Sequence, residues 1–338
     1  MKTKFIYLCA ILLLGANVKA QDHIYSQFYN SPNYLNPALN GQFDGDFRIN
    51  LIYRNQWTSI PGPLNYYSLS ADLNLPKLNG GVGLLVTKTS EGSAYLNKVN
   101  FSGIYSYSVQ FDNSALYFGL QAGVTNRKVD ADKLVFLDQL NSGGIIPNGG
   151  TGASVPVFNN KFYFDSGAGI NVVIGSLRFG ASGQHLNKPN ETLTGVTSLL
   201  PMRFNGYASF RFPLNENFED SPVIIPSAVF YRQAGISSFS GGMQCKYKSV
   251  NIGLWYRGDG QQNDAIVLSF ILDIFTNNSS DKVRFGISHD ATTSRLPYSN
   301  TSGTTEGSLG YETTFPKNED YRSFRNSASS GYRCYDFY

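Results

Sequence analysis

The sequence predicts an all-β fold, a single transmembrane up-and-down β-barrel of about 14 antiparallel strands. Three observations support this prediction: strands of membrane length, connections that differ regularly in length, and many Tyr, Phe and Gly residues. The clearest strands lie in residues 98–127, where apolar residues such as Phe101 and Leu120 alternate with polar or small ones. Successive side chains of a strand point to opposite faces, so each arm has one apolar and one polar face. Each arm exceeds the roughly 9–11 residues that a tilted strand needs to cross a bilayer.

The connections between the predicted strands show a regular pattern of lengths. The strands are predicted at 46–54, 65–75, 80–89, 97–110, 114–127, 161–174, 176–186, 202–212, 223–233, 238–248, 250–257, 264–275, 282–290 and 306–315. Mostly short connections follow the even-numbered strands, whereas long ones follow strands 1, 5, 7 and 13, the longest being 128–160. Transmembrane barrels have short periplasmic turns and longer outer loops. The pattern therefore predicts that both ends of the mature chain are periplasmic, and it disfavours the alternative of a large soluble β-sandwich.

The composition favours the same class of protein. The chain contains 22 Tyr, 24 Phe and 34 Gly. Glycine is a poor helix former, and girdles of aromatic residues flank the apolar band of membrane barrels. No stretch of the mature chain approaches the roughly 18 consecutive apolar residues of a transmembrane helix. The sequence thus predicts membrane crossing by strands and not by helices.

Residues 1–20 are predicted to be a cleaved signal peptide. A basic start at Lys2 and Lys4 precedes an apolar run, and Val18 and Ala20 supply the small side chains that signal peptidase requires for cleavage after position 20. This segment holds three of the 27 basic residues and none of the acidic ones, which leaves 24 of each charge in the mature chain. A neutral balance gives no reason to expect nucleic acid as a partner.

Two further segments flank the predicted barrel at 46–315. Residues 21–45 are predicted to form an irregular N-terminal segment, either periplasmic or folded into the barrel as a plug. Pro32 and Pro37 interrupt regular structure there, because proline restricts its own backbone and that of its predecessor. The aromatic side chains of the segment need a surface on which to pack, which a flexible leader would not provide. Residues 316–338 are predicted to be a polar periplasmic tail.

The same N-terminal stretch begins a series of motifs that resembles the PorP/SprF family of type IX secretion system membrane proteins. The series opens with residues 25–41, continues with Tyr53-Arg54-Asn55-Gln56-Trp57, and follows the family order nearly to the end of the chain. The motif residues taken as structural or partner-binding candidates are Tyr25, Ser26, Gln27, Phe28, Asn36, Pro37, Gly41, Tyr53, Arg54, Trp57, Phe136, Asp138, His185 and Pro189. His289 departs from the aromatic residue expected at its position, so no role is assigned to it.

The resemblance implies an outer-membrane protein of a Bacteroidota-type bacterium, embedded in outer-membrane lipid. It further implies a non-enzymatic component that assists secretion or surface attachment of a partner protein or adhesin with a C-terminal sorting domain, often in gliding motility. The expected partners are the type IX secretion machinery and this cargo, with no small-molecule substrate. One alternative is an outer-membrane channel or transporter for small or hydrophobic solutes. Another is a purely structural barrel.

The residues indicate no catalytic, cofactor-binding or metal site. His185 and His289 lie far apart in the chain, without the Cys or acidic residues at ligand spacing that a metal site would require. No Gly-x-Ser-x-Gly motif marks a hydrolase nucleophile. The glycine-rich run at 141–152 lacks the Gly-Lys-Ser/Thr of a phosphate-binding loop. We therefore expect a protein without enzymatic activity and without a cofactor.

Charged residues at inward positions either form ion pairs within the lumen or are solvated there. Arg48 and Arg54 share the inward face of the first strand, and Asp72 lies on the inward face of the second. Arg257-Gly258-Asp259 is interpreted as the product of a turn, because further Gly, Asn and Asp residues follow it.

Overall fold

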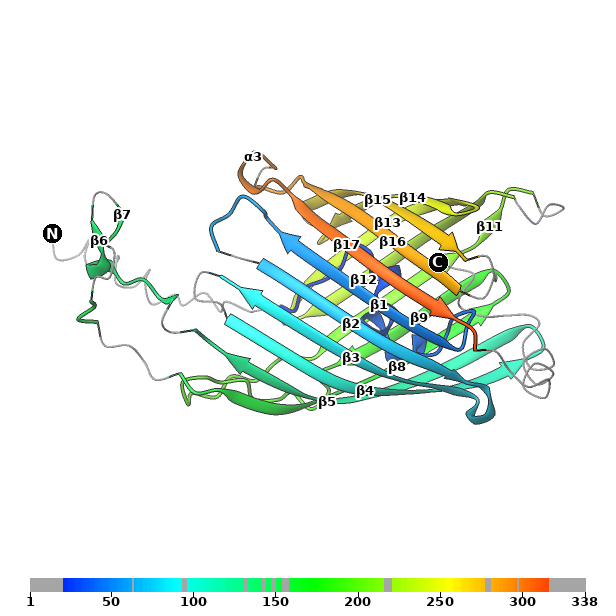
Figure 1. Ribbon diagram of the computed structural model, residues 1–338, viewed down its shortest axis with the longest axis horizontal. Helices are drawn as coiled ribbons and strands as arrows, with labels where there is room; N and C mark the ends of the chain where they lie inside the picture. The colour runs from blue at the N-terminus through cyan, green and yellow to red at the C-terminus, as the bar shows by residue number, and fades with distance from the viewer. Residues whose placement is uncertain are drawn as a thin grey trace.

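The computed structural model describes residues 21–62, 64–92, 96–130, 133–141, 144–146, 150–153, 158–215, 221–276, 281–296 and 298–315. Within these residues the chain forms a closed antiparallel barrel (Figure 1). The predicted signal peptide and the predicted C-terminal tail lie outside the described residues.

Most of the described chain is strand. The strands are β1 (Phe47–Gln56), β2 (Leu64–Leu75), β3 (Gly80–Glu91), β4 (Leu96–Phe111), β5 (Ser114–Lys128), β6 (Leu140–Asn141), β7 (Gly144–Ile145), β8 (Lys161–Ile174), β9 (Leu177–Gln184), β10 (Arg203–Phe210), β11 (Phe212–Pro213), β12 (Val223–Gln233), β13 (Ile236–Tyr247), β14 (Val250–Gly258), β15 (Asn263–Phe275), β16 (Asp281–Thr292) and β17 (Thr304–Thr313). The short helices are η1 (Phe28–Asn30), α2 (Pro32–Leu35), η2 (Pro37–Leu39), η3 (Pro76–Leu78), η5 (Leu137–Gln139) and α3 (Tyr298–Thr301). None of the described helices has the length and apolar character needed to cross a membrane.

The barrel consists of 14 long strands, which confirms the predicted fold. Each long strand pairs with its neighbours in the chain, and β1 pairs with β17 to close the sheet. The very short β11 extends the pairing of β12, while β6 and β7 form a separate hairpin. The predicted strand at 114–127 is β5 almost residue for residue, whereas the predicted strand at 306–315 begins and ends two residues earlier, as β17.

The two faces of the wall differ as the alternation predicts. Outward residues are apolar and exposed, with Phe101 at 55% and Leu120 at 64% of their full accessible surface. Inward residues of the same strands are polar and buried, among them Asn100, Ser102 and Ser106. Such a continuous apolar exterior is costly in water and stable in lipid. The exterior is therefore the surface that faces the membrane.

The barrel has two unlike ends. Long connections join β1 to β2, β5 to β8, β9 to β10 and β16 to β17 at one end, where β6, β7 and α3 project (Figure 1). Mostly short turns such as 112–113 and 248–249 lie at the opposite end. We call these the long-loop end and the short-turn end.

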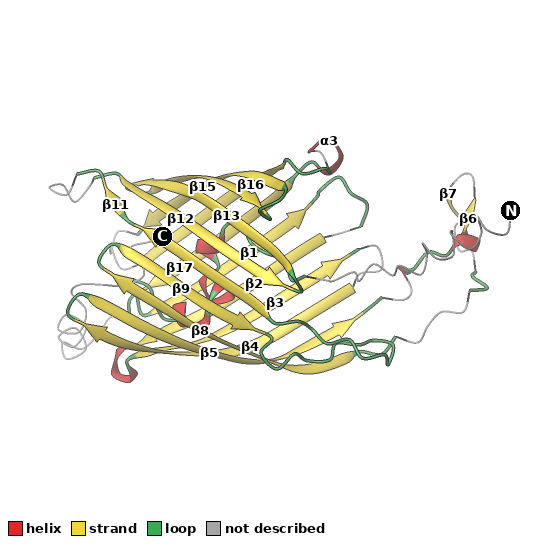
Figure 2. Cartoon of the chain, turned by 180° about the vertical axis from the view of Figure 1, so that it is seen from behind, coloured by secondary structure: helices red, strands yellow, loops and turns green. Residues whose placement is uncertain are grey.

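Residues 21–46, called the N-terminal segment below, fold inside the barrel. Its helices η1, α2 and η2 are enclosed by the wall in both ribbon views (Figures 1 and 2). Phe28 and Leu35 belong to a buried apolar cluster that includes Tyr117 of β5 and Trp255 of β14. The rings of Phe28 and Trp255 meet edge to face, with centroids 5.2 Å apart. This apolar cluster thus lies between the N-terminal segment and the inner wall.

The N-terminal segment runs through the lumen from one end to the other. Asp46 lies at the short-turn end, where its N–H donates to the carbonyl of Thr313. Asp22 lies at the long-loop end, where its N–H donates to Gln233 at the end of β12. The loop lengths predict both mature ends at the short-turn end, and the structure corrects this for the N-terminal end. The reason is that the inward polar groups of the wall bind the segment along its whole length.

The exterior of the barrel gives the first testable prediction. Leu120 lies near the middle of β5 and points outward, so Leu120→Arg should destabilise the membrane-embedded barrel by about 2–4 kcal/mol. The free energy of unfolding would be measured by urea titration in lipid vesicles. Leu137→Arg is the matched control, because Leu137 is 86% exposed in the connection between β5 and β8. Equal stabilities for the two variants would contradict the position of Leu120 in the membrane.

Candidate functional site

The candidate site is the lumen, where the N-terminal segment meets the inner wall. Pro32 and Pro37 occupy the first positions of α2 and η2, where a missing backbone N–H costs little. Asn36 connects the two helices: its Oδ1 accepts a hydrogen bond from the N–H of Ala38 (2.8 Å), and its Nδ2 donates to the carbonyl of Ile170 in β8 (2.9 Å). One side chain thus caps a helix and attaches the segment to the wall.

Glycines on the inward faces of the strands let the segment approach the wall backbone. A Cβ atom added at Gly119 of β5 would overlap the backbone of Pro37 and Ala38. A Cβ atom added at Gly169 of β8 would overlap the side chain of Asn36. The absence of a side chain at these wall positions therefore fits the path of the segment.

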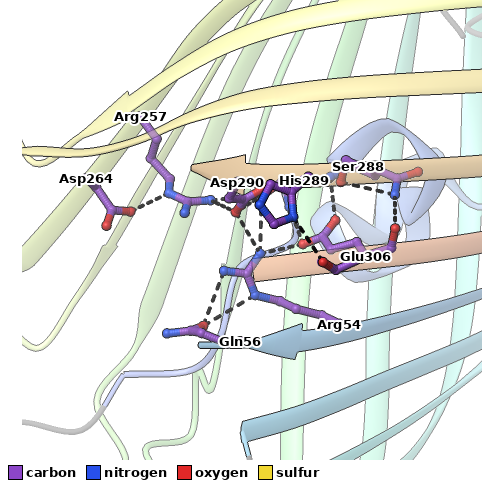
Figure 3. Close-up of polar contacts among 11 residues, drawn as sticks. Arg54, Gln56, Arg257, Asp264, Ser288, His289, Asp290 and Glu306 are labelled. Carbon is purple, nitrogen blue, oxygen red and sulfur yellow. Dashed lines mark hydrogen bonds and ion pairs between the residues drawn. The ribbon is translucent and has the colours of Figure 1, made fainter. Parts of the chain in front are cut away.

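A buried carboxylate from the last strand holds the start of the segment. Glu306 of β17 accepts hydrogen bonds from the backbone N–H groups of Ser26 (2.8 Å) and Gln27 (2.9 Å). The same carboxylate forms an ion pair with Arg54 of β1 (Figure 3). Ser26 also donates from its hydroxyl to Asp290 of β16 (2.6 Å). All of these charges are almost fully buried, so each depends on its partner for compensation.

Arg257 extends this network to β14. Its guanidinium forms ion pairs with Asp290 (3.0 Å) and Asp264, and donates to the hydroxyl of Ser26 (2.8 Å) (Figure 3). The strand predicted at 250–257 already includes Arg257, and β14 ends one residue later, at Gly258, so the predicted turn follows from Asp259. The side chain of Arg257 points inward and is 5% exposed, because the acidic groups of the lumen compensate its charge.

A second ion pair holds the end of the segment near the short-turn end. Arg48 of β1 makes two hydrogen bonds to Asp72 of β2, at 3.0 and 2.7 Å. Asp72 also accepts from the N–H of Gly41 (2.7 Å), and Arg48 donates to the carbonyl of Leu39 (3.3 Å). Of the two alternatives for these inward charges, ion pairs and solvated groups, the structure shows ion pairs. Arg48 pairs with Asp72, and Arg54 pairs with other carboxylates.

A third cluster lies at the long-loop end around Asp22. Its carboxylate contacts Lys98 of β4 (2.9 Å) and His185 just beyond β9 (2.7 Å). The other ring nitrogen of His185 lies 2.9 Å from the carboxylate of Asp165. Burial opposes ionisation of Asp22, but Lys98 and His185 outweigh it and hold the pKa of Asp22 well below its usual value. Burial likewise opposes the charge on His185, yet the two carboxylates raise the pKa of His185 to about 9.

Aromatic rings surround the next residue of the segment. The ring of His23 stacks on those of Tyr66 (centroids 4.2 Å apart) and Tyr34 (5.1 Å). Burial, with help from the charge of Arg203, holds the pKa of His23 well below its usual value, so the ring is neutral. The guanidinium of Arg203 lies over the rings of Tyr34 (4.9 Å) and Tyr231 (5.0 Å), at cation–π distance.

A cavity of about 350 Å³ lies beside this aromatic cluster at the long-loop end. We call it the vestibule. It is bounded by the first residues of the N-terminal segment, by residues of the inner wall and by the surrounding connections, and Asp22, His23, Trp57, Arg203 and Tyr231 all line it. Its volume is within the range of small-ligand pockets in proteins.

Most motif residues from the sequence come together in the lumen. Those of the N-terminal segment are Tyr25, Ser26, Gln27, Phe28, Asn36, Pro37 and Gly41. Arg54 and His185 bind this segment through the contacts described above. Their positions fit a structural role, and partner binding by these residues stays a prediction.

The remaining motif residues lie elsewhere. Tyr53 points outward and is 36% exposed, while Trp57 lines the vestibule. Phe136 and Asp138 lie in the long connection between β5 and β8, away from the lumen network. Pro189 is buried in the connection between β9 and β10, where its carbonyl accepts from Leu200 (2.9 Å).

Sequence reasoning missed the wall residues that hold the segment in place. These include Asp165, Arg203, Asp290 and Glu306. Each is a charged residue at an inward position of a strand, which is the one signal that could have marked it. The partners of these residues could not be read in this way, since Glu306 binds residues 279 and 280 positions earlier in the chain.

Comparisons with known proteins identify a family. The family model described as type IX secretion system membrane protein PorP/SprF matches residues 17–311. No protein with curated annotation matches significantly.

The chain is also similar to several solved structures. A structure titled CymD monoaromatic hydrocarbon channel is 13% identical, with a TM-score of 0.48, over 89% of this chain and 95% of that chain. A Pseudomonas aeruginosa FadL homologue is 10% identical, with a TM-score of 0.47, over 85% and 94%. The Acinetobacter baumannii outer membrane protein Omp33 is 6% identical, with a TM-score of 0.41, over 81% and 100%.

The wall glycines give a second prediction. Gly119→Ala should push residues 37 and 38 away from the wall, and overpacking of this kind costs about 1–3 kcal/mol. Gly307→Ala is the matched control, because a Cβ atom at Gly307 meets no atom within 4 Å. Urea unfolding of both variants, with proteolysis of the N-terminal segment as a local probe, would measure the difference. Equal protection of the segment in both variants would contradict the close contact at Gly119.

The His185 cluster gives a third prediction, on pH. Since folding raises the pKa of His185 from 6.5 to about 9, its stabilisation is complete below about pH 6.5 and is lost as the pH rises through about 9. The difference corresponds to an effect on the order of 3 kcal/mol. We expect proteolytic protection of residues near Asp22 to fall between pH 7 and pH 10, and the profile of His185→Gln to be flatter. His289→Gln serves as control, and an identical pH profile for wild type and His185→Gln would refute the assignment.

Proposed function

The chain belongs to the PorP/SprF family of type IX secretion system membrane proteins, and we propose that it assists the secretion or surface attachment of a partner protein. The family and the barrel fold place the protein in the outer membrane. Membership of the family also implies interaction with the type IX secretion machinery. The proposed cargo is a surface protein or adhesin with a C-terminal sorting domain. The proposed role includes gliding motility, and we propose that this protein itself catalyses no reaction.

The observation that carries this proposal is the filled lumen. The N-terminal segment extends from Asp22 at the long-loop end to Asp46 at the short-turn end. Along this path it is bound by Glu306, Asp290 and Asp72 of the wall. A wide channel for diffusing solutes needs an open lumen, whereas a protein that holds a partner needs a stable body and an accessible surface. The geometry supports the second role.

The connection between β5 and β8 supplies such a surface. Leu137 and Ile145 are 86% and 63% exposed in it. Asp138 accepts hydrogen bonds from the N–H of Gly152 (2.7 Å) and the hydroxyl of Thr151 (2.9 Å), and these lower its pKa. Long connections face outward in outer-membrane barrels, and exposed apolar residues near a charge suit recognition of a protein. This supports partner binding at the long-loop end.

The same observation disfavours the alternative function, a channel or transporter for small or hydrophobic solutes. Transport through the lumen would require release of the N-terminal segment from its buried ion pairs. Removing one partner from a buried pair typically costs about 3–5 kcal/mol.

Deletion of the gene tests the proposed function. We expect surface labelling and mass spectrometry to show at least a tenfold loss of one or a few surface proteins with a C-terminal sorting domain, restored by the gene in trans. Unchanged surface proteins together with slower uptake of a solute would refute the proposal in favour of a channel.

A point variant tests the proposed binding surface separately. Asp138→Ala removes the hydrogen bonds to Thr151 and Gly152 without touching the barrel, so we expect surface display to fall several-fold while the barrel folds normally. Asp112→Ala, in the turn between β4 and β5 at the short-turn end, is the matched control. Equal display in the two variants would show that partner binding does not use the connection between β5 and β8.

A further inference from the structure

The guanidinium of Arg203 is a buried cation that no carboxylate contacts directly. Arg203 is the first residue of β10 and is 2% exposed. It donates through Nε to Asn205 Oδ1 (3.0 Å), and through Nη1 to the hydroxyl of Tyr34 (2.6 Å) and the carbonyl of His23 (3.1 Å). Its Nη2 atom has no hydrogen-bond partner in the described part of the chain. A buried charge with an unused donor group destabilises the folded protein unless a ligand accepts a hydrogen bond from that group.

Other charged groups that line the vestibule already have partners. Arg54 is paired with Glu306, and Arg257 is paired with Asp264. Asp22 lies near Arg203, but its carboxylate oxygens are taken by Lys98, His185 and Gln233. Arg203 thus differs from Arg54 and Arg257 in lacking an acidic partner at hydrogen-bond distance.

Arg203 also borders two cavities at the long-loop end. It lines both the vestibule and a smaller adjoining cavity of about 50 Å³. His23 lines the same two cavities, and its Nε2 atom has no hydrogen-bond partner either. Trp57 and Tyr66 line the vestibule beside them and offer aromatic surface to an apolar group. One unpaired positive charge, a neutral ring nitrogen and aromatic walls suit a carboxylate attached to an apolar group.

We propose that the vestibule binds a carboxylate, with Arg203 Nη2 as the anchoring donor and His23 Nε2 as a second polar contact. A monoanion fits better than a phosphate dianion, because Arg203 is a single positive charge and the carboxylate of Asp22 lines the same cavity. The carboxylate comes either from the free C-terminus of a partner polypeptide or from a small organic acid. The polypeptide source rests on the proposed function, while the binding site itself does not.

Titration of the full-length protein in detergent tests the proposal. The probes are acetyl-Ala-Ala-Phe with a free carboxylate, the same peptide as a carboxamide, sodium benzoate and inorganic phosphate. Binding is followed by calorimetry and by the fluorescence of Trp57, one of only two tryptophans in the chain. We expect the peptide carboxylate to bind at least tenfold tighter than its carboxamide, as a charged hydrogen bond predicts. Preference for the peptide over benzoate identifies a polypeptide terminus, and equal binding of both identifies a small organic acid.

Three outcomes would overturn the carboxylate site: equal binding of carboxylate and carboxamide, tighter binding of phosphate, or no binding of any probe at millimolar concentration. Arg203→Gln should abolish the preference for carboxylate, whereas Arg232→Gln, at an exposed position of neighbouring β12, should leave it intact. Because Arg203 also contacts Tyr34, folding of the variant is checked by heat-modifiability on gels. The comparison of carboxylate with carboxamide on the wild-type protein needs no variant. Carboxylate binding with unchanged surface display in the deletion strain would separate this site from the proposed function.

Discussion

The first long strand, β1, pairs with the last, β17. The pairing runs from Phe47–Thr313 to Gln56–Thr304. In lipid every backbone N–H and C=O group must find a partner within the protein, so the sheet is stable only when this seam closes. Closure around 14 strands encloses a lumen that wall side chains alone do not fill. The N-terminal segment fills that space, and the buried ion pairs of the lumen attach it to the wall.

The lumen achieves charge balance by matching opposite charges from distant strands. Glu306 and Asp290 face Arg54 and Arg257, and the backbone of the segment completes the carboxylate of Glu306. The segment covers these groups and donates hydrogen bonds to Glu306. It therefore contributes to stabilising the buried charges. Arg203 differs from these arginines, because its guanidinium has no direct contact with a carboxylate in the described chain.

The parts of this structure that could be predicted from sequence are those with a local signal. Residues 98–127 predict two strands, because apolar and polar side chains alternate there without interruption. Arg48 and Asp72 both lie at inward positions of adjacent strands, so they are placed to meet. The place of Asp22 at the long-loop end has no such signal, since it depends on contacts with Gln233 and His185 far along the chain. The ion pair of Arg257 with Asp290 has no local signal either, because it joins β14 to β16. Long-range pairing, and not composition, decides these positions.

The attachment of Ser26 and Gln27 to Glu306 has a consequence for how the protein assembles. Their hydrogen-bond partner lies on β17, 280 and 279 residues later in the chain, and the ion-pair partner of Glu306 lies on β1. The two strands that close the seam thus also bind the start of the segment. Contacts so distant in sequence form late, because a long loop must be closed before they contribute. We therefore expect binding of the segment at Glu306 and closure of the wall to occur together, late in assembly.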